Sequence, residues 1–120
     1  MEPRKLVVYQ NDPNAAQSLV VSLSQHFESI KLALRYEEVR PAITRTHADV
    51  LILDMEKSQP DEIARLHREF PSLCIVGTHR LADDQLWAQA LNQGAADVCE
   101  PRHDVILRSL LHECAQHAAA

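Results

Sequence analysis

Glycine and cysteine are scarce in this 120-residue chain, and no hydrophobic run is long. Its two glycines cannot supply the glycine-rich loop that a dinucleotide-binding site or a P-loop places after the first strand. The three cysteines form no CxxC pair, so we expect no disulfide framework. The longest apolar runs, such as residues 50–53, are far shorter than the roughly 20 residues of a membrane span.

A basic excess is also missing. Lys and Arg number 12 against 17 Asp and Glu, which gives a formal net charge of −5 with neutral histidine. No run of Lys or Arg stands out, so the composition argues against direct nucleic-acid binding. The N-terminus leads straight into a strand-like run at residues 6–9 rather than into the apolar segment of a signal peptide. The chain length is that of one domain, and we expect a soluble, cytoplasmic one.

Apolar runs of strand length alternate with segments of helical periodicity five times along the chain. Strands are predicted at residues 6–9, 30–36, 50–53, 73–76 and 96–99. The apolar stripes of the predicted helices fall within residues 16–27, 39–43, 63–70, 86–91 and 107–114. Such strict alternation predicts a parallel sheet with right-handed crossovers and helices on both faces.

Capping residues mark the ends of two of the predicted helices. Asn11 or Asp12 can cap the first helix, because Pro13 fits its first turn. Asp83 or Asp84 opens the fourth helix, and Gly94 is expected to close it in the left-handed conformation.

Polar side chains follow four of the predicted strands, at the edge where open α/β sheets bind their ligands. They are Asn11 and Asp12, then Asp54 and Glu56, then Thr78 and His79, and finally Glu100 and Pro101. Acidic side chains and a hydroxyl that converge on one edge would suit a hard, oxygen-preferring cation such as Mg²⁺.

Five short segments, in order, carry a likeness to a known family: VVYQND at residues 7–12, LILD at 51–54, IVGT at 75–78, QGA at 93–95 and EP at 100–101. With them the chain resembles, from residue 5 to 116, the receiver domain of response regulators, the phospho-acceptor module of two-component signalling. The resemblance implies a flavodoxin-like (βα)5 fold with strand order 2-1-3-4-5. It implies a receiver-like domain at residues 5–117, between a lead at 1–4 and a frayed tail at 118–120.

The resemblance also implies roles for the polar residues. Asp54 would accept a phosphoryl group from a kinase phosphohistidine. Asp12 and Asp54 would bind Mg²⁺ together with the backbone carbonyl of Glu56, and Asn11 is a further candidate ligand. Thr78 would be the switch hydroxyl that moves onto the phosphoryl group. The implied partners are a histidine kinase or another signalling protein, an output domain in a longer parent chain, and a second copy bound through the fourth and fifth helices.

Two departures from the family pattern weaken the expected site. Asn11 stands where the family usually has an acidic residue, which removes one ligand charge. His79 follows the switch residue where a small residue is usual, and its ring could hinder access to the phosphoryl site.

The largest departure is the missing lysine, whose place before Pro101 is taken by Glu100. A unit charge pair at about 4 Å is worth on the order of 4 kcal/mol at an effective dielectric constant near 20, so exchanging a cation for an anion is costly for a bound phosphoryl group. Arg102 and Lys57 are the candidates to compensate. We therefore expect an atypical, non-enzymatic receiver whose Asp54 is phosphorylated weakly or not at all.

Two alternatives remain. The chain could be a constitutive docking or dimerisation domain that keeps the receiver fold without a switch. An aspartyl phosphatase using Asp54 and Glu56 as an acid pair is disfavoured, because the positioned lysine and the cap segments of such enzymes are missing.

Overall fold

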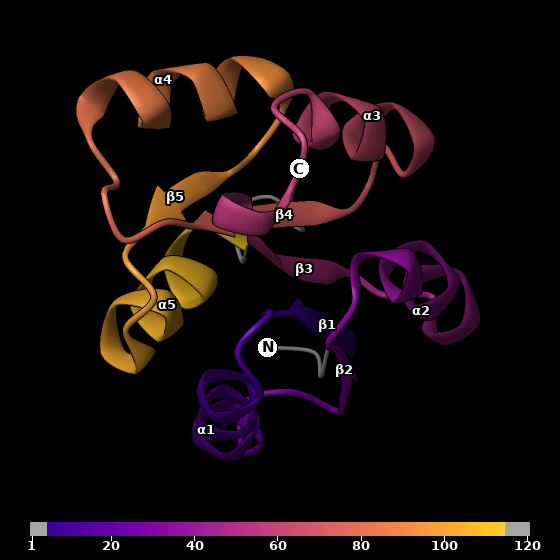
Figure 1. Cartoon of the computed structure of the whole chain (residues 1–120). Coiled ribbons are helices and arrows are strands. Elements are labelled where there is room, and N and C mark those ends of the chain that lie inside the picture. The colour runs from indigo at the N-terminus through magenta and orange to yellow at the C-terminus, as the bar shows by residue number, and fades with distance from the viewer. Residues whose placement is uncertain (1–4, 115–120) are drawn as a thin grey trace.

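A computed structural model describes residues 5–114, which form a single five-stranded parallel sheet with helices on both faces (Figure 1). The strands are β1 (Lys5–Tyr9), β2 (Ser29–Ala33), β3 (Val50–Asp54), β4 (Cys74–Thr78) and β5 (Asp97–Cys99). Their order is β2-β1-β3-β4-β5, and every pair is parallel, so the predicted fold class and strand order are confirmed. The predicted lead (1–4), the tail (118–120) and residues 115–117 lie outside the described residues.

A helix follows each strand. They are α1 (Pro13–Leu23), α2 (Val39–Thr46), α3 (Glu62–Glu69), α4 (Asp84–Gln93) and α5 (His103–Ser109), which continues as a π-helical segment over Leu110–Cys114. Short 3₁₀ turns precede α2 at Tyr36–Glu38 and follow β3 at Met55–Lys57. Among residues 5–114, no helix is both long and apolar enough to cross a membrane.

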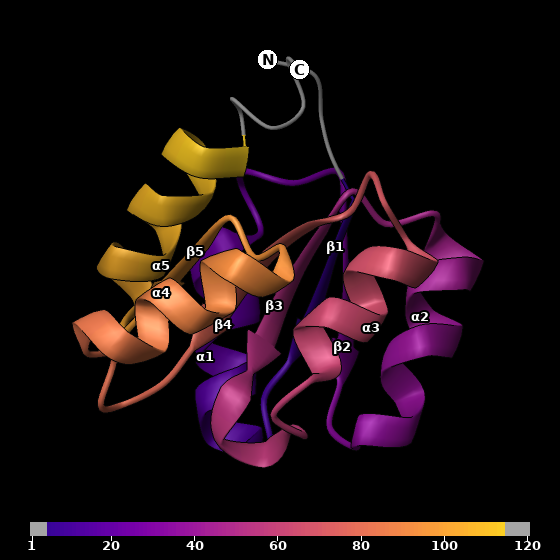
Figure 2. The same ribbon diagram turned by 90° about the horizontal axis from the view of Figure 1, so that it is seen from above.

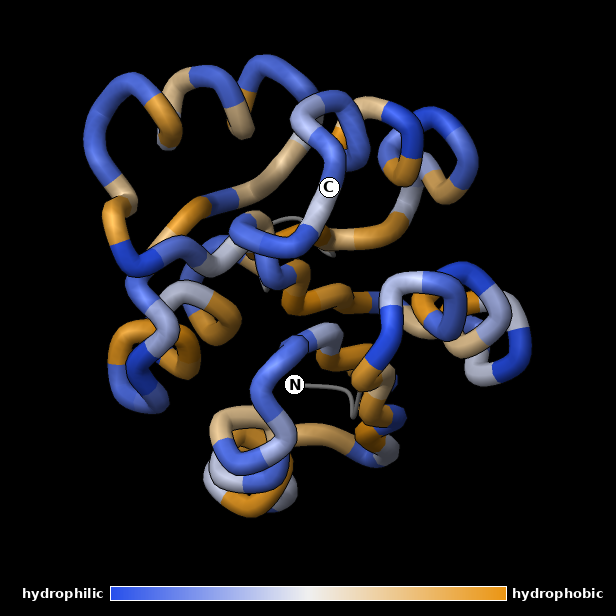
Figure 3. The backbone as a smooth tube through the Cα atoms, viewed as in Figure 1, coloured by the Kyte–Doolittle hydropathy of each residue, from blue (hydrophilic) through white to orange (hydrophobic). Residues whose placement is uncertain are grey.

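Alternate residues of the strands point to opposite faces of the sheet and build two separate cores. Val7, Leu51 and Ile75 belong to the core beneath α2, α3 and α4. The other core lies between the sheet and helices α1 and α5, which share one side of the sheet in Figure 1, while α3 and α4 lie in front of the strands in Figure 2. Its members include Val8, Ile52, Val76, Leu19 and Ile106. The hydropathy colouring shows the apolar strands as the centre of the molecule (Figure 3). The apolar runs of the strands are uninterrupted because helices cover both faces of the sheet.

The predicted caps are confirmed. Asp12 precedes α1 and accepts a hydrogen bond from the Asn14 backbone N–H at 3.0 Å. Asp83 does the same for α4 through the N–H of Leu86 at 2.8 Å. Gly94 ends α4 with a φ of 117°, a conformation that residues with a Cβ rarely adopt.

The second strand is shorter than predicted. It ends at Ala33 instead of continuing to residue 36. The carboxylate of Glu38 accepts the backbone N–H groups of Leu34 and Arg35 at 3.1 and 3.0 Å. These bonds direct the chain into the 3₁₀ turn that begins at Tyr36. The alternation of apolar and polar residues therefore continues past the end of the strand.

The expectation of no disulfide framework is wrong, because Cys74 and Cys114 form a disulfide. They are 40 residues apart, and no spacing motif connects them. The start of β4 and the end of the last helical segment meet in the core that α1 and α5 cover. Cys99 is the free cysteine among the described residues; burial, with smaller contributions from Asp97 and Glu100, raises the pKa of its thiol to about 12.

A buried ion pair joins α2 to α3 on the other side of the sheet. Glu62 is only 1% exposed, and its carboxylate lies 2.7 Å from the guanidinium of Arg40. Arg40 also donates to Glu69 at 2.7 Å and to the hydroxyl of Tyr36 at 3.0 Å. Burial acts to lower the pKa of Arg40, but these partners outweigh it and raise the pKa.

Candidate functional site

The carboxyl ends of the strands enclose an acidic pocket with a volume of about 330 Å³. Polar side chains from the ends of β3 and β4 and from the segments that follow β1, β3 and β4 dominate its walls. The lining residues are Gln10, Asn11, Asp12, Ala15, Asp54, Glu56, Lys57, Thr78, Arg80 and Pro101. The predicted edge of the sheet is thus the place where most of the candidate residues meet.

Asp54 ends the central strand and is buried, with 8% of its surface exposed. One carboxylate oxygen accepts the backbone N–H of Glu56 at 3.1 Å, and the other accepts that of Asn11 at 3.3 Å. The backbone carbonyl of Asp54 accepts the Ser58 hydroxyl at 2.7 Å. These bonds hold the carboxylate in place at the pocket, where it can serve as a nucleophile or as a metal ligand.

Thr78 ends β4 beside Asp54 in the strand register, and its hydroxyl is already engaged. Gln10 donates a side-chain hydrogen bond to the Thr78 Oγ1 at 2.9 Å, and both residues are buried. The threonine hydroxyl also lies 3.5 Å from the carbonyl oxygen of Leu53. Movement of this hydroxyl toward Asp54 would therefore have to break the bond to Gln10.

Gln10 is a site residue that the sequence reasoning missed. Its signal was present, because Gln10 is the first polar residue after the buried run of β1 and so stands at the ligand-binding edge. The family pattern gives the roles after this strand to Asn11 and Asp12. Both line the pocket, but both are exposed, and the Asp12 carboxylate caps α1.

Arg80 is the second missed residue and, with Lys57, one of two cations that line the pocket. Its Nε donates to Glu56 at 2.9 Å, and its backbone N–H donates to the same carboxylate at 3.2 Å. Desolvation acts to raise the pKa of Glu56, but the hydrogen bonds and positive charge of Arg80 outweigh it and lower the pKa. The Glu56–Arg80 pair therefore links the segments that follow β3 and β4 beside the pocket.

The two cations suggested from the sequence lie in different places. Lys57 lines the acidic pocket. Arg102 does not; it is exposed, precedes α5 and lies 3.4 Å from Asp104. Glu100 is exposed and outside the lining, whereas Pro101 belongs to it.

His79 is not among the residues that line the acidic pocket. Its Nδ1 accepts the backbone N–H of Leu81 at 3.0 Å, and its ring lines a neighbouring cleft instead. The hindrance expected from the sequence stays a prediction, since the lining of the unliganded pocket does not test access for a phosphoryl donor.

The donors of the pocket fit a magnesium ion only in part. Three carboxylates (Asp12, Asp54 and Glu56) and two cations (Lys57 and Arg80) line it, which leaves a balance of −1. Among residues 5–114, no three His, Cys, Asp or Glu side chains are arranged to hold a metal ion. Asp12 is committed to its helix and Glu56 to Arg80, so Asp54 is the carboxylate best placed for a metal.

Neither a protein-family model nor a curated protein matches the chain. Solved structures do. A response regulator from Thermotoga maritima has a TM-score of 0.83 at 18% identity, covering 95% of this chain and 99% of its own. A two-component response regulator from Clostridium difficile has a TM-score of 0.81 at 21% identity, covering 98% and 99%. A BeF3-activated DrrB receiver domain has a TM-score of 0.77 at 19% identity, covering 96% and 99%. The chain therefore has the fold of response-regulator receiver domains, as the resemblance implied.

Proposed function

We propose that the chain is a receiver-like signalling module, spanning residues 5–117, that acts by protein–protein interaction rather than as an enzyme. In this proposal Asp54 is the phospho-acceptor, and it is phosphorylated weakly or not at all. The observation that carries the proposal is the placement of Asp54: a buried carboxylate at the end of the central strand, held by two backbone N–H groups and open to a polar pocket.

Weak phosphorylation follows from the surroundings of Asp54. Thr78, the proposed switch residue, is held by Gln10, so recruiting its hydroxyl costs a buried hydrogen bond. The cation Arg80 is paired with Glu56. Lys57 is the remaining cation of the lining, and Glu100 stands where the family has its lysine. A phosphoryl dianion would therefore receive less compensating charge than in the family pattern.

Magnesium binding belongs to the same proposal. The ion would be held by Asp54 and Asp12, with the backbone carbonyl of Glu56 and the amide of Asn11 as neutral donors. It would supply charge neutralisation for the transferring phosphoryl group. Because Lys57 and Arg80 line the same pocket, we expect weak binding.

The test is a backbone amide NMR spectrum with and without Mg²⁺ and beryllofluoride, repeated on Asp54→Asn. We expect small shifts at Asp54, Asp12 and Thr78 that need Mg²⁺ and vanish in the variant. Intact mass after incubation with acetyl phosphate and Mg²⁺ should show little or no adduct. A stable stoichiometric adduct would contradict the weak site, and an unchanged spectrum would leave the docking alternative.

A charge variant sharpens this test. Glu100→Lys restores the family's cation and should raise the yield of the Asp54 adduct. Glu28→Lys is the matched control, because Glu28 is exposed next to the start of β2, at the opposite edge of the sheet, and the charge change is identical. Equal yields in the two variants would show that the charge at position 100 does not limit phosphorylation.

The proposed contact face for partners consists of α4, β5 and α5. Trp87 is 46% exposed there, and its indole donates to Asp97 at 3.0 Å. Ser109 of α5 donates to the other oxygen of Asp97 at 2.6 Å, so one carboxylate ties the three elements together. This arrangement supports docking to a histidine kinase, to an output domain in a longer chain or to a second copy. If the second copy is the occupant, sedimentation should show a dimer that Trp87→Ala weakens.

A further inference from the structure

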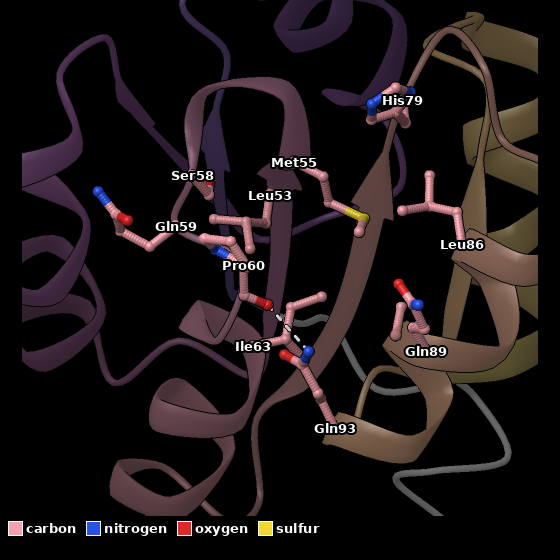
Figure 4. Close-up of a pocket in the computed structure, with 11 residues that line it drawn as sticks. Leu53, Met55, Ser58, Gln59, Pro60, Ile63, His79, Leu86, Gln89 and Gln93 are labelled. Atoms are coloured by element: carbon pink, nitrogen blue, oxygen red, sulfur yellow. Dashed lines mark hydrogen bonds between the residues drawn. The ribbon is translucent and has the colours of Figure 1, made fainter.

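A second opening lies between the loop after β3, the start of α3, and α4 (Figure 4). We call it the neutral cleft; its volume is about 230 Å³. Apolar side chains form much of its wall: Leu53, Met55, Pro60, Ile63, Leu86 and Ala90. No Asp, Glu, Lys or Arg occurs among the described residues that line it. Its character is therefore opposite to that of the acidic pocket.

The cleft also carries a few polar groups suited to neutral hydrogen bonds. They are the carboxamides of Gln59, Gln89 and Gln93, the hydroxyl of Ser58 and the imidazole of His79. Because the His79 Nδ1 accepts a backbone hydrogen bond, the proton of the neutral ring lies on Nε2, where it is available as a donor. An apolar wall with a few polar groups is the usual composition of a small-molecule site.

The frame of the cleft is held by hydrogen bonds across its base. Gln93 of α4 donates to the carbonyl of Pro60 at 2.9 Å, the bond drawn in Figure 4, and accepts the backbone N–H of Ala64 at 3.2 Å. These bonds join α4 to the start of α3. A preformed opening of this kind does not have to be ordered by its ligand.

The neutral cleft and the acidic pocket lie back to back along the same chain segments. Met55 lines the cleft, while its neighbours Asp54 and Glu56 line the pocket. On β4, Gly77 leaves room for the Met55 side chain, since a Cβ at this position would overlap the Met55 sulfur. A molecule in the cleft would therefore touch the residue that separates Asp54 from Glu56.

We propose that the neutral cleft binds a small, uncharged aromatic molecule. The absence of charged residues from the described lining favours a neutral ligand, since an ion would be desolvated there without a partner. The Met55 thioether favours an aromatic ring, because sulfur–aromatic contacts are attractive. The volume lies below the roughly 300–1,000 Å³ of sites for drug-sized ligands, which indicates a ligand of one or two rings. This inference does not depend on whether Asp54 accepts a phosphoryl group.

The experiment is an amide NMR titration of the chain with indole and benzamide as neutral probes, and with benzoate and benzylammonium as charged counterparts. We expect saturable shifts at Met55, His79 and Gln89 with indole or benzamide at a dissociation constant of about 1 mM or tighter. The charged probes should bind at least tenfold more weakly. Absence of saturable shifts with both neutral probes would overturn the proposal, as would equal binding of the charged ones.

Variants locate the binding. Gln89→Trp fills the cleft from α4 and should weaken binding at least tenfold. Gln85→Trp is the matched control, because Gln85 lies on the same helix, is exposed and is not part of the lining. Gly77→Ala, which must displace the Met55 side chain, provides a second and independent block. Binding that survives both Gln89→Trp and Gly77→Ala would place the probe elsewhere and refute the assignment.

Discussion

The two sides of the sheet are consolidated by different chemistry. The core under α1 and α5 is apolar and is closed by the Cys74–Cys114 disulfide. The side covered by α2, α3 and α4 holds a buried ion pair, Glu62 with Arg40, and it also contains the neutral cleft. The disulfide needs no charged partner but can be opened by a reductant, whereas a buried ion pair depends on both partners being present and charged.

This difference assigns distinct vulnerabilities to the two sides. A buried carboxylate is tolerated only while a cation and donors compensate for its lost hydration, so losing one partner is worse than losing both. A disulfide acts largely by restricting the unfolded chain. Its loss leaves no buried charge without a partner in the folded state. We therefore expect the largest single effect on the ionic side.

Arg40→Ala should destabilise the protein more than opening the Cys74–Cys114 disulfide does. It leaves Glu62, at 1% exposure, without the guanidinium that lies 2.7 Å away, and it removes hydrogen bonds to Tyr36 and Glu69. Removing one partner of a buried pair typically costs about 3–5 kcal/mol. Urea unfolding followed by circular dichroism measures the loss.

Arg45→Ala is the matched control for this variant, since Arg45 is exposed on the same helix. It should change the free energy of unfolding by less than about 0.5 kcal/mol. Equal losses in the two variants would mean that the Arg40–Glu62 pair does not stabilise the fold.

Opening the disulfide tests the other side. Reduction with a dithiol, or Cys114→Ala, should lower the free energy of unfolding by about 2–4 kcal/mol, because the 40-residue loop between the cysteines is no longer restrained in the unfolded chain. The measurement is thermal unfolding with and without reductant. The reductant should have no further effect on Cys114→Ala; a drop of the same size there would show that it acts through another route.

Gly94→Ala probes the join between α4 and α3 and should cost less. The φ of 117° is strained for a residue with a Cβ, at roughly 1–2 kcal/mol, and the new Cβ would overlap the ring of His67. Chemical denaturation compares it with Gly94→Asn, since Asn tolerates the left-handed region better than Ala does. If Ala were as stable as Gly, the backbone conformation at position 94 would not be a constraint.

The sequence predicted the fold because its signals are local and repeated. Buried strands such as residues 50–53 are apolar throughout, and the caps at Asp12, Asp83 and Gly94 act on their own helices. The predicted second strand is too long because the carboxylate of Glu38 takes the backbone donors of Leu34 and Arg35. Contacts that depend on tertiary packing have no local pattern in the sequence. The Cys74–Cys114 bond could not be predicted because it joins residues 40 positions apart.

The sequence predicted that the site lies at the carboxyl edge of the sheet, but it did not predict which charged side chains pair with one another there. Asp54 and Thr78 could be placed because each ends a buried strand. Which cation enters the pocket could not be deduced, because Arg80 reaches Glu56 across two strands, 24 residues apart in sequence, while Arg102 turns to Asp104. The direction of each side chain decides which cation enters the pocket. That direction is set by loops, whose residues show no hydrophobic periodicity from which it could be deduced.

Removing the Glu56–Arg80 pair should have the smallest effect on stability, and it compares the buried ion pair of Arg40 with an ion pair at the surface. Arg80 lowers the pKa of Glu56, so the pair stabilises the fold above the ordinary carboxyl pKa of 4.5, and this stability is lost as the pH falls through the lower folded value. Because the Arg80 side chain is 78% exposed, solvent screens the pair, and Arg80→Ala should cost less than about 1 kcal/mol at neutral pH. The difference in the free energy of unfolding between the unsubstituted protein and Arg80→Ala should shrink as the pH falls below about 4. Denaturant unfolding at pH 3 to 7 measures this difference. A difference that stays constant over this range would show that Arg80 stabilises the loop by packing and not through the charge of Glu56.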